Sequence, residues 1–219
     1  MTDPAYRDYW RRKELLASVP AFPVRRWWAS ESLCDIERVY FDAIRAAPDV
    51  LDVGAGDLRV MKRMQAAGYS GTWHNQDVGT EFRYEYASLD DVKRQYGAVL
   101  CLDVIEHLTL GDGLRLLDRL IQIVVPGGVL IIQTPNARCI RHPLGWDMTH
   151  LHVYNAPDLW AWFTARGLEC HGYRVRFGEP ESGFAKLRAQ ASAWVISRLL
   201  GSDYADNILL LAKLPAIAQ

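Results

Sequence analysis

A glycine-containing turn between two apolar segments is the first feature of this chain that could bind a ligand. Residues 50–53 form a short apolar run that includes Asp52. Gly54 and Gly56 follow this run, and an amphipathic segment begins at Leu58. Glycines let a backbone approach a ligand closely, and the free N–H groups at a helix start point toward it. The pattern predicts a buried strand, a turn and a helix, the arrangement that holds nucleotide-like cofactors in open α/β sheets.

Acidic residues close two further apolar runs, at Asp77 and at Asp103. A carboxylate at the tip of the second strand is placed to bind ribose hydroxyls. The alternative for Asp77 is a turn residue before Gly79. A dinucleotide site needs a third glycine where this chain has Arg59, so a nicotinamide oxidoreductase is disfavoured. The residues favour a ligand with ribose and amine groups and no diphosphate, and S-adenosylmethionine is such a ligand.

Histidines near these strand ends are candidates for proton transfer. A histidine with an ordinary pKa of about 6.5 can take a proton near neutral pH. We expect His150 to be the first candidate for a general base, oriented by Asp147 three residues earlier, and His107 to be the second. The alternatives are that His107 caps the following helix and that His150 fixes its loop to the core. No metal is expected, because the spacing in this loop matches no standard zinc pattern: His142, Asp147, His150 and His152.

Apolar periodicity predicts the elements that must position these residues. Helical spacing covers residues 32–46, 58–67, 110–125, 156–167 and 184–200. Strand-like runs cover residues 50–53, 71–77, 97–103, 129–134, 168–177 and 207–214. The alternation of Phe82, Tyr84 and Tyr86 adds a strand within residues 80–91, third in chain order. Alternating strands and helices predict a doubly wound, mostly parallel α/β sheet with its active-site groups at the carboxyl ends of the strands.

Residues 1–47 precede this sheet and are expected to form an N-terminal helical extension, whereas residues 48–219 form the ligand-binding domain. Ser30 or Ser32 could cap a helix in the extension. The extension interleaves basic and aromatic residues between Tyr6 and Trp28. These aromatic side chains could cover a substrate pocket as a lid, or they could simply pack against the domain.

Charge and composition narrow the partners and the compartment. The 219 residues carry a formal net charge of −1, so no overall basic field attracts nucleic acid. Four scattered cysteines without a C-x-x-C spacing favour a reducing, cytoplasmic compartment over disulfides. We find no signal-peptide pattern and no apolar run of membrane-spanning length, so no membrane association is expected. The oligomeric state stays open.

Taken together, four blocks resemble the class I S-adenosylmethionine-dependent methyltransferases: residues 51–56 (Leu-Asp-Val-Gly-Ala-Gly), Asp77, residues 99–108 (Val-Leu-Cys-Leu-Asp-Val-Ile-Glu-His-Leu) and residues 125–132 (Val-Pro-Gly-Gly-Val-Leu-Ile-Ile). The resemblance implies a Rossmann-like, seven-stranded sheet whose last strand runs antiparallel. It also implies binding residues. The methionine end would lie at Asp52, Gly54 and Gly56, and the ribose at Asp77 with Val78 beside it. A loop that contains Asp103 and Val104 would close over the cofactor.

One position departs from that pattern. Where many members have an acid that meets the adenine amine, this chain has Ser88 and Leu89, with Asp90 two residues beyond Ser88. Backbone groups would then supply the adenine contact.

A second set of residues is similar to a narrower branch of the family. Residues 135–138 (Pro-Asn-Ala-Arg), residues 146–154 and the helix after them resemble methyltransferases of polysaccharide and nucleotide-sugar biosynthesis, and in part the ubiquinone O-methyltransferases. The resemblance implies methyl transfer to a small molecule, at a hydroxyl of a sugar-linked or other biosynthetic metabolite. The alternative is a non-catalytic protein that binds S-adenosylmethionine or a metabolite on the same fold. An anionic acceptor would suit a group of arginines, which could equally be solvated: Arg25, Arg26, Arg138, Arg141, Arg174 and Arg176.

Overall fold

A seven-stranded sheet forms the centre of the molecule in the computed structural model, which describes residues 4–216. The strands lie in the order β1-β6-β7-β5-β4-β2-β3. Only β7 runs antiparallel to its neighbours, as expected of the last strand. The strand bounds are β1 Val24–Trp27, β2 Asp49–Val53, β3 Thr72–Gln76, β4 Tyr96–Leu102, β5 Val124–Pro135, β6 Glu169–Phe177 and β7 Asn207–Lys213.

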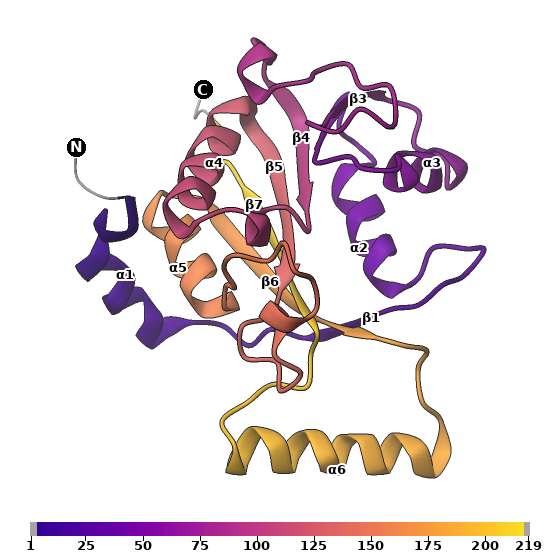
Figure 1. The fold of residues 1–219 in the computed structure, drawn as a ribbon, viewed down its shortest axis with the longest axis vertical. Helices are drawn as coiled ribbons and strands as arrows, with labels where there is room; N and C mark the ends of the chain where they lie inside the picture. The colour runs from indigo at the N-terminus through magenta and orange to yellow at the C-terminus, as the bar shows by residue number, and fades with distance from the viewer. Residues whose placement is uncertain (1–3, 217–219) are drawn as a thin grey trace.

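Helices cover both faces of the sheet (Figure 1), as a doubly wound fold requires. Helices α2 (Asp35–Ile44) and α3 (Arg59–Ala66) pack on one face. Helices α4 (Leu110–Ile123) and α5 (Ala156–Ala165) pack on the other, with α1 (Tyr9–Leu15) beside α5. Helix α6 (Gly183–Leu199) is drawn apart from the rest, below the sheet. The two hydrophobic cores hold the strands firmly, so that the loops at the strand ends are carried on a rigid support.

The predicted strand within residues 80–91 is wrong. Only Tyr86 forms a bridge, to Gln76, and the segment then turns into a short 3₁₀ helix, Leu89–Asp91. The Tyr84 hydroxyl donates to the Gly56 carbonyl at 2.8 Å, so the alternating aromatic side chain faces the glycine turn. The alternation of aromatic residues therefore reflects a loop folded over the end of β3.

Strand β1 was missed by the sequence patterns. Val24–Trp27 pairs in parallel with Arg174–Phe177 at the far edge of the sheet. Its two arginines obscured the apolar pattern, and the expected helical extension consequently contains this strand as well as α1 and α2. The sheet has seven strands, as expected, but the predicted strand within residues 80–91 is absent and β1 at the opposite edge takes its place in the count.

Helix α2 begins at a different residue from the one expected. Its N-cap is Cys34, not Ser30 or Ser32, and the Cys34 backbone N–H donates to the Glu37 carboxylate at 2.9 Å. Glu37 is buried and also pairs with Arg63 of α3. Arg63 donates in addition to the carbonyls of Ser30 and Ser32, each at 2.9 Å. The Arg63 guanidinium therefore ties the segment before α2 to α3.

We expect Arg63→Met to lower the free energy of unfolding by about 2 kcal/mol, since it leaves a buried carboxylate without its cation. Burial raises the pKa of Glu37, but the hydrogen bonds from Arg63 and Cys34 outweigh burial and lower it overall. A lowered pKa means that the pair stabilises the fold above the pKa of an unfolded glutamate and that this contribution is lost as the pH falls. Urea unfolding at pH 7 and pH 4 measures this. The matched control is Arg45→Met, whose exposed pair with Asp42 spans 4.0 Å and contributes little; equal losses in the two variants would contradict the account.

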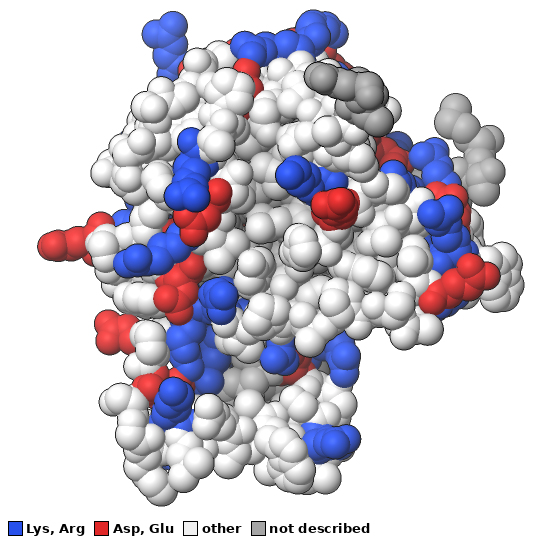
Figure 2. Space-filling view, turned by 180° about the vertical axis from the view of Figure 1, so that it is seen from behind, with Lys and Arg blue, Asp and Glu red and all other residues white. Residues whose placement is uncertain are grey.

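The surface carries charges of both signs. On the face shown in Figure 2, lysines and arginines are interspersed with aspartates and glutamates, and no broad basic area stands out. Within residues 4–216 no helix has the length and apolarity needed to cross a membrane.

Candidate active site

The glycine turn after β2 has a backbone that other residues adopt with strain. Gly54 and Gly56 have φ of +72° and +49°, in the left-handed region that favours glycine. The N–H groups of Gly54 and Ala55 both donate to the Gln76 carbonyl, at 2.8 and 3.1 Å. A Cβ on Gly54 would lie 2.3 Å from Val104 Cγ2. Gly54 is therefore packed against Val104, and the turn is fixed against the ends of β3 and β4.

Asp77 lies against this turn, as the sequence predicted for the acid after β3. One carboxylate oxygen accepts from the Gly56 N–H at 2.8 Å and the other accepts from the Gly79 N–H at 2.7 Å. Asp77 therefore does act as a turn residue before Gly79, as the alternative interpretation expected. Carboxylate oxygens have further lone pairs, so Asp77 keeps the capacity to accept from a ligand hydroxyl.

Asp52 is a buried acid without a partner on one oxygen. The residue is 2% exposed, and its Oδ2 atom has no hydrogen-bond partner among the described residues. Burial, and after it the charge of Asp77, raises the pKa of Asp52 to about 7. A buried carboxylate of this kind favours a cationic or hydrogen-bond-donating ligand.

Asp103 is held at the end of β4 by two amides. Its Oδ2 accepts from Gln133 Nε2 at 2.8 Å, and its Oδ1 accepts from Asn207 Nδ2 at 2.7 Å. The Tyr40 hydroxyl donates in turn to Gln133 Oε1. The sequence analysis missed these three residues; the usable signal was polar side chains inside apolar strands, at Gln133 in β5 and Asn207 in β7.

A cavity of about 370 Å³ lies between the glycine turn and the end of β4. The predicted residues Asp52, Gly54, Gly56 and Asp103 line it, together with the Glu37–Arg63 pair and Arg59. Its aromatic wall is Trp27 and Phe177, whose rings meet edge to face at 5.7 Å. Trp27 comes from β1, so the N-terminal segment contributes a wall that belongs to the sheet.

Four predicted binding residues, Asp77, Val78, Ser88 and Leu89, lie on the loop after β3, outside the lining of that cavity. Val78 is 86% exposed beside Asp77. Ser88 caps the 3₁₀ helix by accepting from the Asp90 N–H at 3.2 Å, and Leu89 packs against the core. The loop nevertheless reaches the glycine turn through Asp77 and Tyr84.

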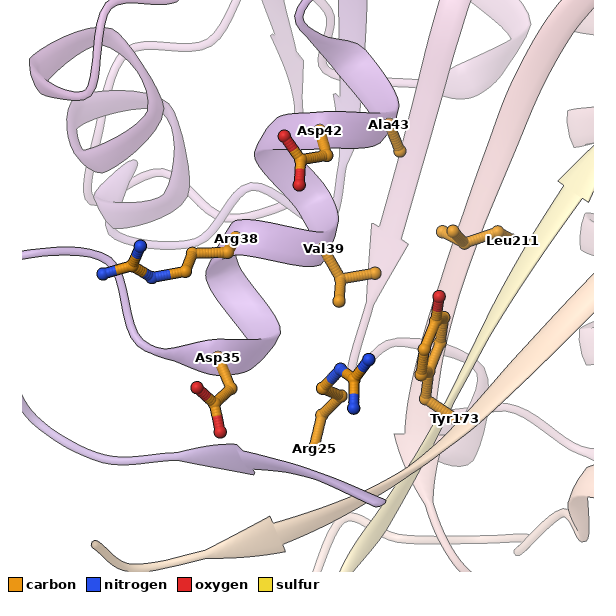
Figure 3. Close-up of a pocket in the computed structure, with 8 residues that line it drawn as sticks. All are labelled: Arg25, Asp35, Arg38, Val39, Asp42, Ala43, Tyr173 and Leu211. Carbon is orange, nitrogen blue, oxygen red and sulfur yellow. The ribbon is translucent and has the colours of Figure 1, made fainter. Parts of the chain in front are cut away.

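A larger hollow, of about 540 Å³, lies elsewhere, between α2 and the strands β1, β6 and β7. Figure 3 shows Val39 and Ala43 of α2 on one side of it and Tyr173 and Leu211 on the other. The guanidinium of Arg25 packs over the Tyr173 ring. Its lining includes none of the strand-end acids or histidines, so it does not compete with the crevice as a catalytic site.

The predicted catalytic residues meet beside Asp103, with a different pairing from the one expected. The rings of His107 and His150 lie 5.0 Å apart, edge to face. His150 Nδ1 donates to the Pro143 carbonyl at 2.8 Å rather than to Asp147. Asp147 instead accepts from the Thr149 hydroxyl at 2.6 Å, and this hydroxyl accepts from His107 Nδ1 at 2.8 Å. Asp147 thus orients His107 through Thr149 and does not contact His150. Sequence spacing alone could not show which of the two histidines the loop brings close to Asp147.

Glu106 completes this cluster from the turn after β4. It is 1% exposed, and the Thr134 hydroxyl donates to its Oε2 at 2.9 Å. Burial, and then the charge of Asp103, raises the pKa of Glu106 to about 8. The N–H groups of Leu151 and His152 donate to the Glu106 carbonyl at 2.8 and 3.1 Å. These two bonds fix the loop that carries His150 to the turn that carries His107.

The arginines considered for an anion pocket are mostly paired with acids. Arg174 pairs with Asp203 at 3.1 Å, and Arg176 pairs with Glu181 at 2.8 Å. Arg26 contacts Glu181 and Arg141 contacts Asp206, whereas Arg138 donates to the Gly201 carbonyl and Arg25 packs over the Tyr173 ring. These contacts neutralise much of the positive charge that an anionic ligand would need.

Known proteins share this fold and these segments. The family described as "Methyltransferase domain" matches residues 25–172. The chain is 24% identical over 149 residues to the ubiquinone biosynthesis O-methyltransferase of Rickettsia canadensis. That alignment covers 55% of this chain and 62% of the relative, so the chain spans less than two thirds of the relative's length.

Solved structures show the fold. A SAM-dependent methyltransferase from Archaeoglobus fulgidus superposes with a TM-score of 0.59 at 14% identity, covering 95% of this chain and 98% of that one. The N-methyltransferase NodS from Bradyrhizobium japonicum, solved with S-adenosyl-l-homocysteine, gives 0.52 at 15%, covering 94% and 98%. The [4+2]-cyclase SpnF gives 0.54 at 13%, covering 98% and 95%. Because the family match covers more than half of the chain, from β1 into the first residues of β6, this protein belongs to the methyltransferase domain family.

Proposed function

We propose that this protein transfers the methyl group of S-adenosylmethionine to a hydroxyl of a small-molecule acceptor. The observation that carries the proposal is the crevice itself. The glycine turn, the unpartnered Asp52 carboxylate and the anchored Asp77 and Asp103 meet at one sheet edge, beside the His107–His150 pair.

The residues of the crevice fit the cofactor. Asp52 offers a buried oxygen without a partner, which suits the ammonium of the methionine end. Asp77 stands where two ribose hydroxyls could donate to it, and its own hydrogen bonds to Gly56 and Gly79 already fix its orientation. Ser88 and Leu89 leave the adenine contact to backbone groups of the same loop, with Val78 beside it.

The cofactor supplies a methyl group activated by a sulfonium, and the protein has to align an acceptor with it. His150 and His107 are the residues proposed to take the hydroxyl proton. In both rings Nδ1 is the donor, so Nε2 of the neutral imidazole carries the lone pair. Asp147 is a positioning residue, which fixes His107 through Thr149.

The acceptor is proposed to be a sugar-linked or other biosynthetic metabolite. The Rickettsia relative is named as an O-methyltransferase, which supports oxygen as the methylated atom. The cavity wall of Trp27 and Phe177 suits the apolar face of a ring. The paired arginines favour a neutral acceptor over an anionic one. We propose a cytoplasmic location, because free cysteines such as the four in this chain are typical of a reducing compartment.

The non-catalytic alternative is less favoured. The fold is shared with a [4+2]-cyclase, and fold alone does not fix a reaction. A protein that only held a metabolite would have no use for two oriented imidazoles beside the cofactor crevice. Calorimetric binding of S-adenosylhomocysteine without transfer to any member of a panel of hydroxylated sugars and phenols would favour the alternative.

The affinity for S-adenosylhomocysteine is expected to rise between pH 6 and pH 8. Asp52, with its pKa raised to about 7, is neutral at the lower pH and charged at the higher one. Only the carboxylate attracts the ligand ammonium, so deprotonation strengthens binding. Calorimetry across this range measures the effect. In Asp52→Asn the affinity is expected to be lower and nearly independent of pH; an unchanged pH profile in this variant would show that Asp52 does not contact the charged end.

A further inference from the structure

We propose that Glu106, His107 and His150 bind a divalent transition-metal ion beside the cofactor crevice. Each side chain offers one ligand atom, and the three atoms lie within 4.8 Å of one another. Two imidazole nitrogens and one carboxylate form a ligand set that Zn²⁺ and other divalent transition metals accept in proteins. The chemistry of the ion rests on the proposed function, whereas its binding can be tested separately.

The outer hydrogen bonds of both histidines leave free the nitrogen that a metal needs. His150 Nδ1 donates to the Pro143 carbonyl, which can only accept. His107 Nδ1 donates to the Thr149 hydroxyl, because this hydroxyl gives its own proton to Asp147. The Nε2 atom of each neutral ring is therefore a lone-pair donor. Metal-binding histidines are commonly oriented in this way by a carbonyl or by a carboxylate-linked partner.

Glu106 is a buried carboxyl that lacks a cation. Thr134 donates one hydrogen bond to it, and among residues 4–216 no lysine, arginine or histidine forms an ion pair with it. A buried carboxylate is costly unless it is paired or coordinates a metal. An ion between Glu106 and the two histidines would supply the missing charge.

The backbone holds the two ligand-bearing segments together before any ion binds. The Glu106 carbonyl accepts from the N–H groups of Leu151 and His152, which directly follow His150. A tetrahedral ion with bonds of about 2.1 Å requires ligand atoms roughly 3.4 Å apart. The ligand atoms, which lie within 4.8 Å of one another, would move closer together when the ion binds. The spacing of His142, Asp147, His150 and His152 predicted no metal site, because two of the ligands, Glu106 and His107, follow β4 and lie outside that loop.

The position of the site indicates a role in activating the acceptor. An ion there would lower the pKa of a neighbouring hydroxyl, as bound cations do. In the metal-bound form the two imidazoles are ligands and not bases, so the hydroxyl proton would pass to water. The oxygen would form its bond to the methyl carbon, and the carbon–sulfur bond would break with its electron pair left on sulfur. With three protein ligands a tetrahedral ion keeps one open position, where the acceptor oxygen would bind.

The test is a titration of the full chain, stripped with EDTA and dialysed, with Co²⁺ followed by visible absorption and with Zn²⁺ followed by calorimetry. We expect one ion per chain. His107→Ala, His150→Ala and Glu106→Gln should each weaken binding by at least about 100-fold, and Thr149→Val, which removes only the outer partner of His107, by about 10-fold. The matched control is His142→Ala, an exposed histidine of the same loop, which should bind as the wild type does. Circular dichroism and urea unfolding verify that each variant is folded.

Absence of stoichiometric binding, or an equal loss in His142→Ala, would overturn the proposed site. Equal methyl transfer by the stripped and the Zn²⁺-loaded protein would overturn the role of the ion in activating the acceptor. If the ion binds as expected but no methyl transfer occurs with any acceptor, the proposed function fails and the metal site stands.

Discussion

Replacing Asp77 by alanine is expected to weaken the binding of S-adenosylhomocysteine by about 100-fold, since two hydrogen bonds from ribose hydroxyls to a carboxylate are lost. The variant also leaves the N–H groups of Gly56 and Gly79 without their acceptor, which loosens the glycine turn itself. Calorimetry with the wild type and the variant measures the change in affinity.

Two further variants separate the contact from a general effect on the loop. Asp77→Asn keeps one oxygen and the side-chain volume, so an intermediate loss of affinity is expected. Glu81→Ala removes an acid from the same loop that accepts only from the neighbouring Thr80 N–H, and it should leave binding unchanged. Wild-type affinity in Asp77→Ala would place the ribose elsewhere.

The second large effect concerns turnover. His150→Ala and His107→Ala are each expected to lower kcat by about 100-fold or more, the usual contribution of a group that assists proton removal. Both imidazoles are proposed to face the acceptor and not the cofactor, so the affinity for S-adenosylhomocysteine should stay within a factor of about two of the wild type. Initial rates with a saturating acceptor, together with calorimetry, separate the two quantities.

Asp147→Asn provides the graded comparison for this prediction. Asp147 contacts His107 only through Thr149, so its loss should cost about 10-fold in kcat and little in the Michaelis constant. Unchanged turnover in both histidine variants would show that alignment of the acceptor is sufficient and that neither ring assists the reaction.

Much of the fold could be predicted because the apolar periods of this chain agree with its elements. The helix at 110–125 and the strands around Asp52 and Asp103 appear within a few residues of the expected bounds. The glycines were informative for a physical reason, since a Cβ at Gly54 would collide with Val104. The order of strand, turn and acid therefore predicted that the glycine turn, Asp77 and Asp103 follow neighbouring strands, as β3, β2 and β4 are.

The parts that could not be predicted depend on contacts between distant segments. The sequence of strand β1 is charged because it contains two arginines. Their contacts at the sheet edge, such as that of Arg26 with Glu181, join distant parts of the chain and cannot be predicted from the segment alone. The aromatic alternation around Tyr84 resembled a strand, but the hydroxyl of Tyr84 donates to Gly56.

The candidate catalytic residues show the same limit. Asp147 and His150 are close in sequence, yet the loop presents the carboxylate to Thr149 and His107. The approach of Glu106 to both imidazoles arises from the joining of two segments by the Glu106 carbonyl, which no spacing within one segment reveals.

Methyl transfer to a hydroxyl of a small molecule is tested by an assay with S-adenosylmethionine deuterated in its methyl group. The purified protein is incubated with hydroxylated sugars, phenols and a metabolite extract, and the products are identified by mass spectrometry. We predict a small-molecule product that carries the labelled methyl on oxygen, formed by the wild type and lost in Asp77→Ala. Transfer of the label to a nitrogen or carbon atom, or formation of the product at the same rate by Asp77→Ala, would contradict it.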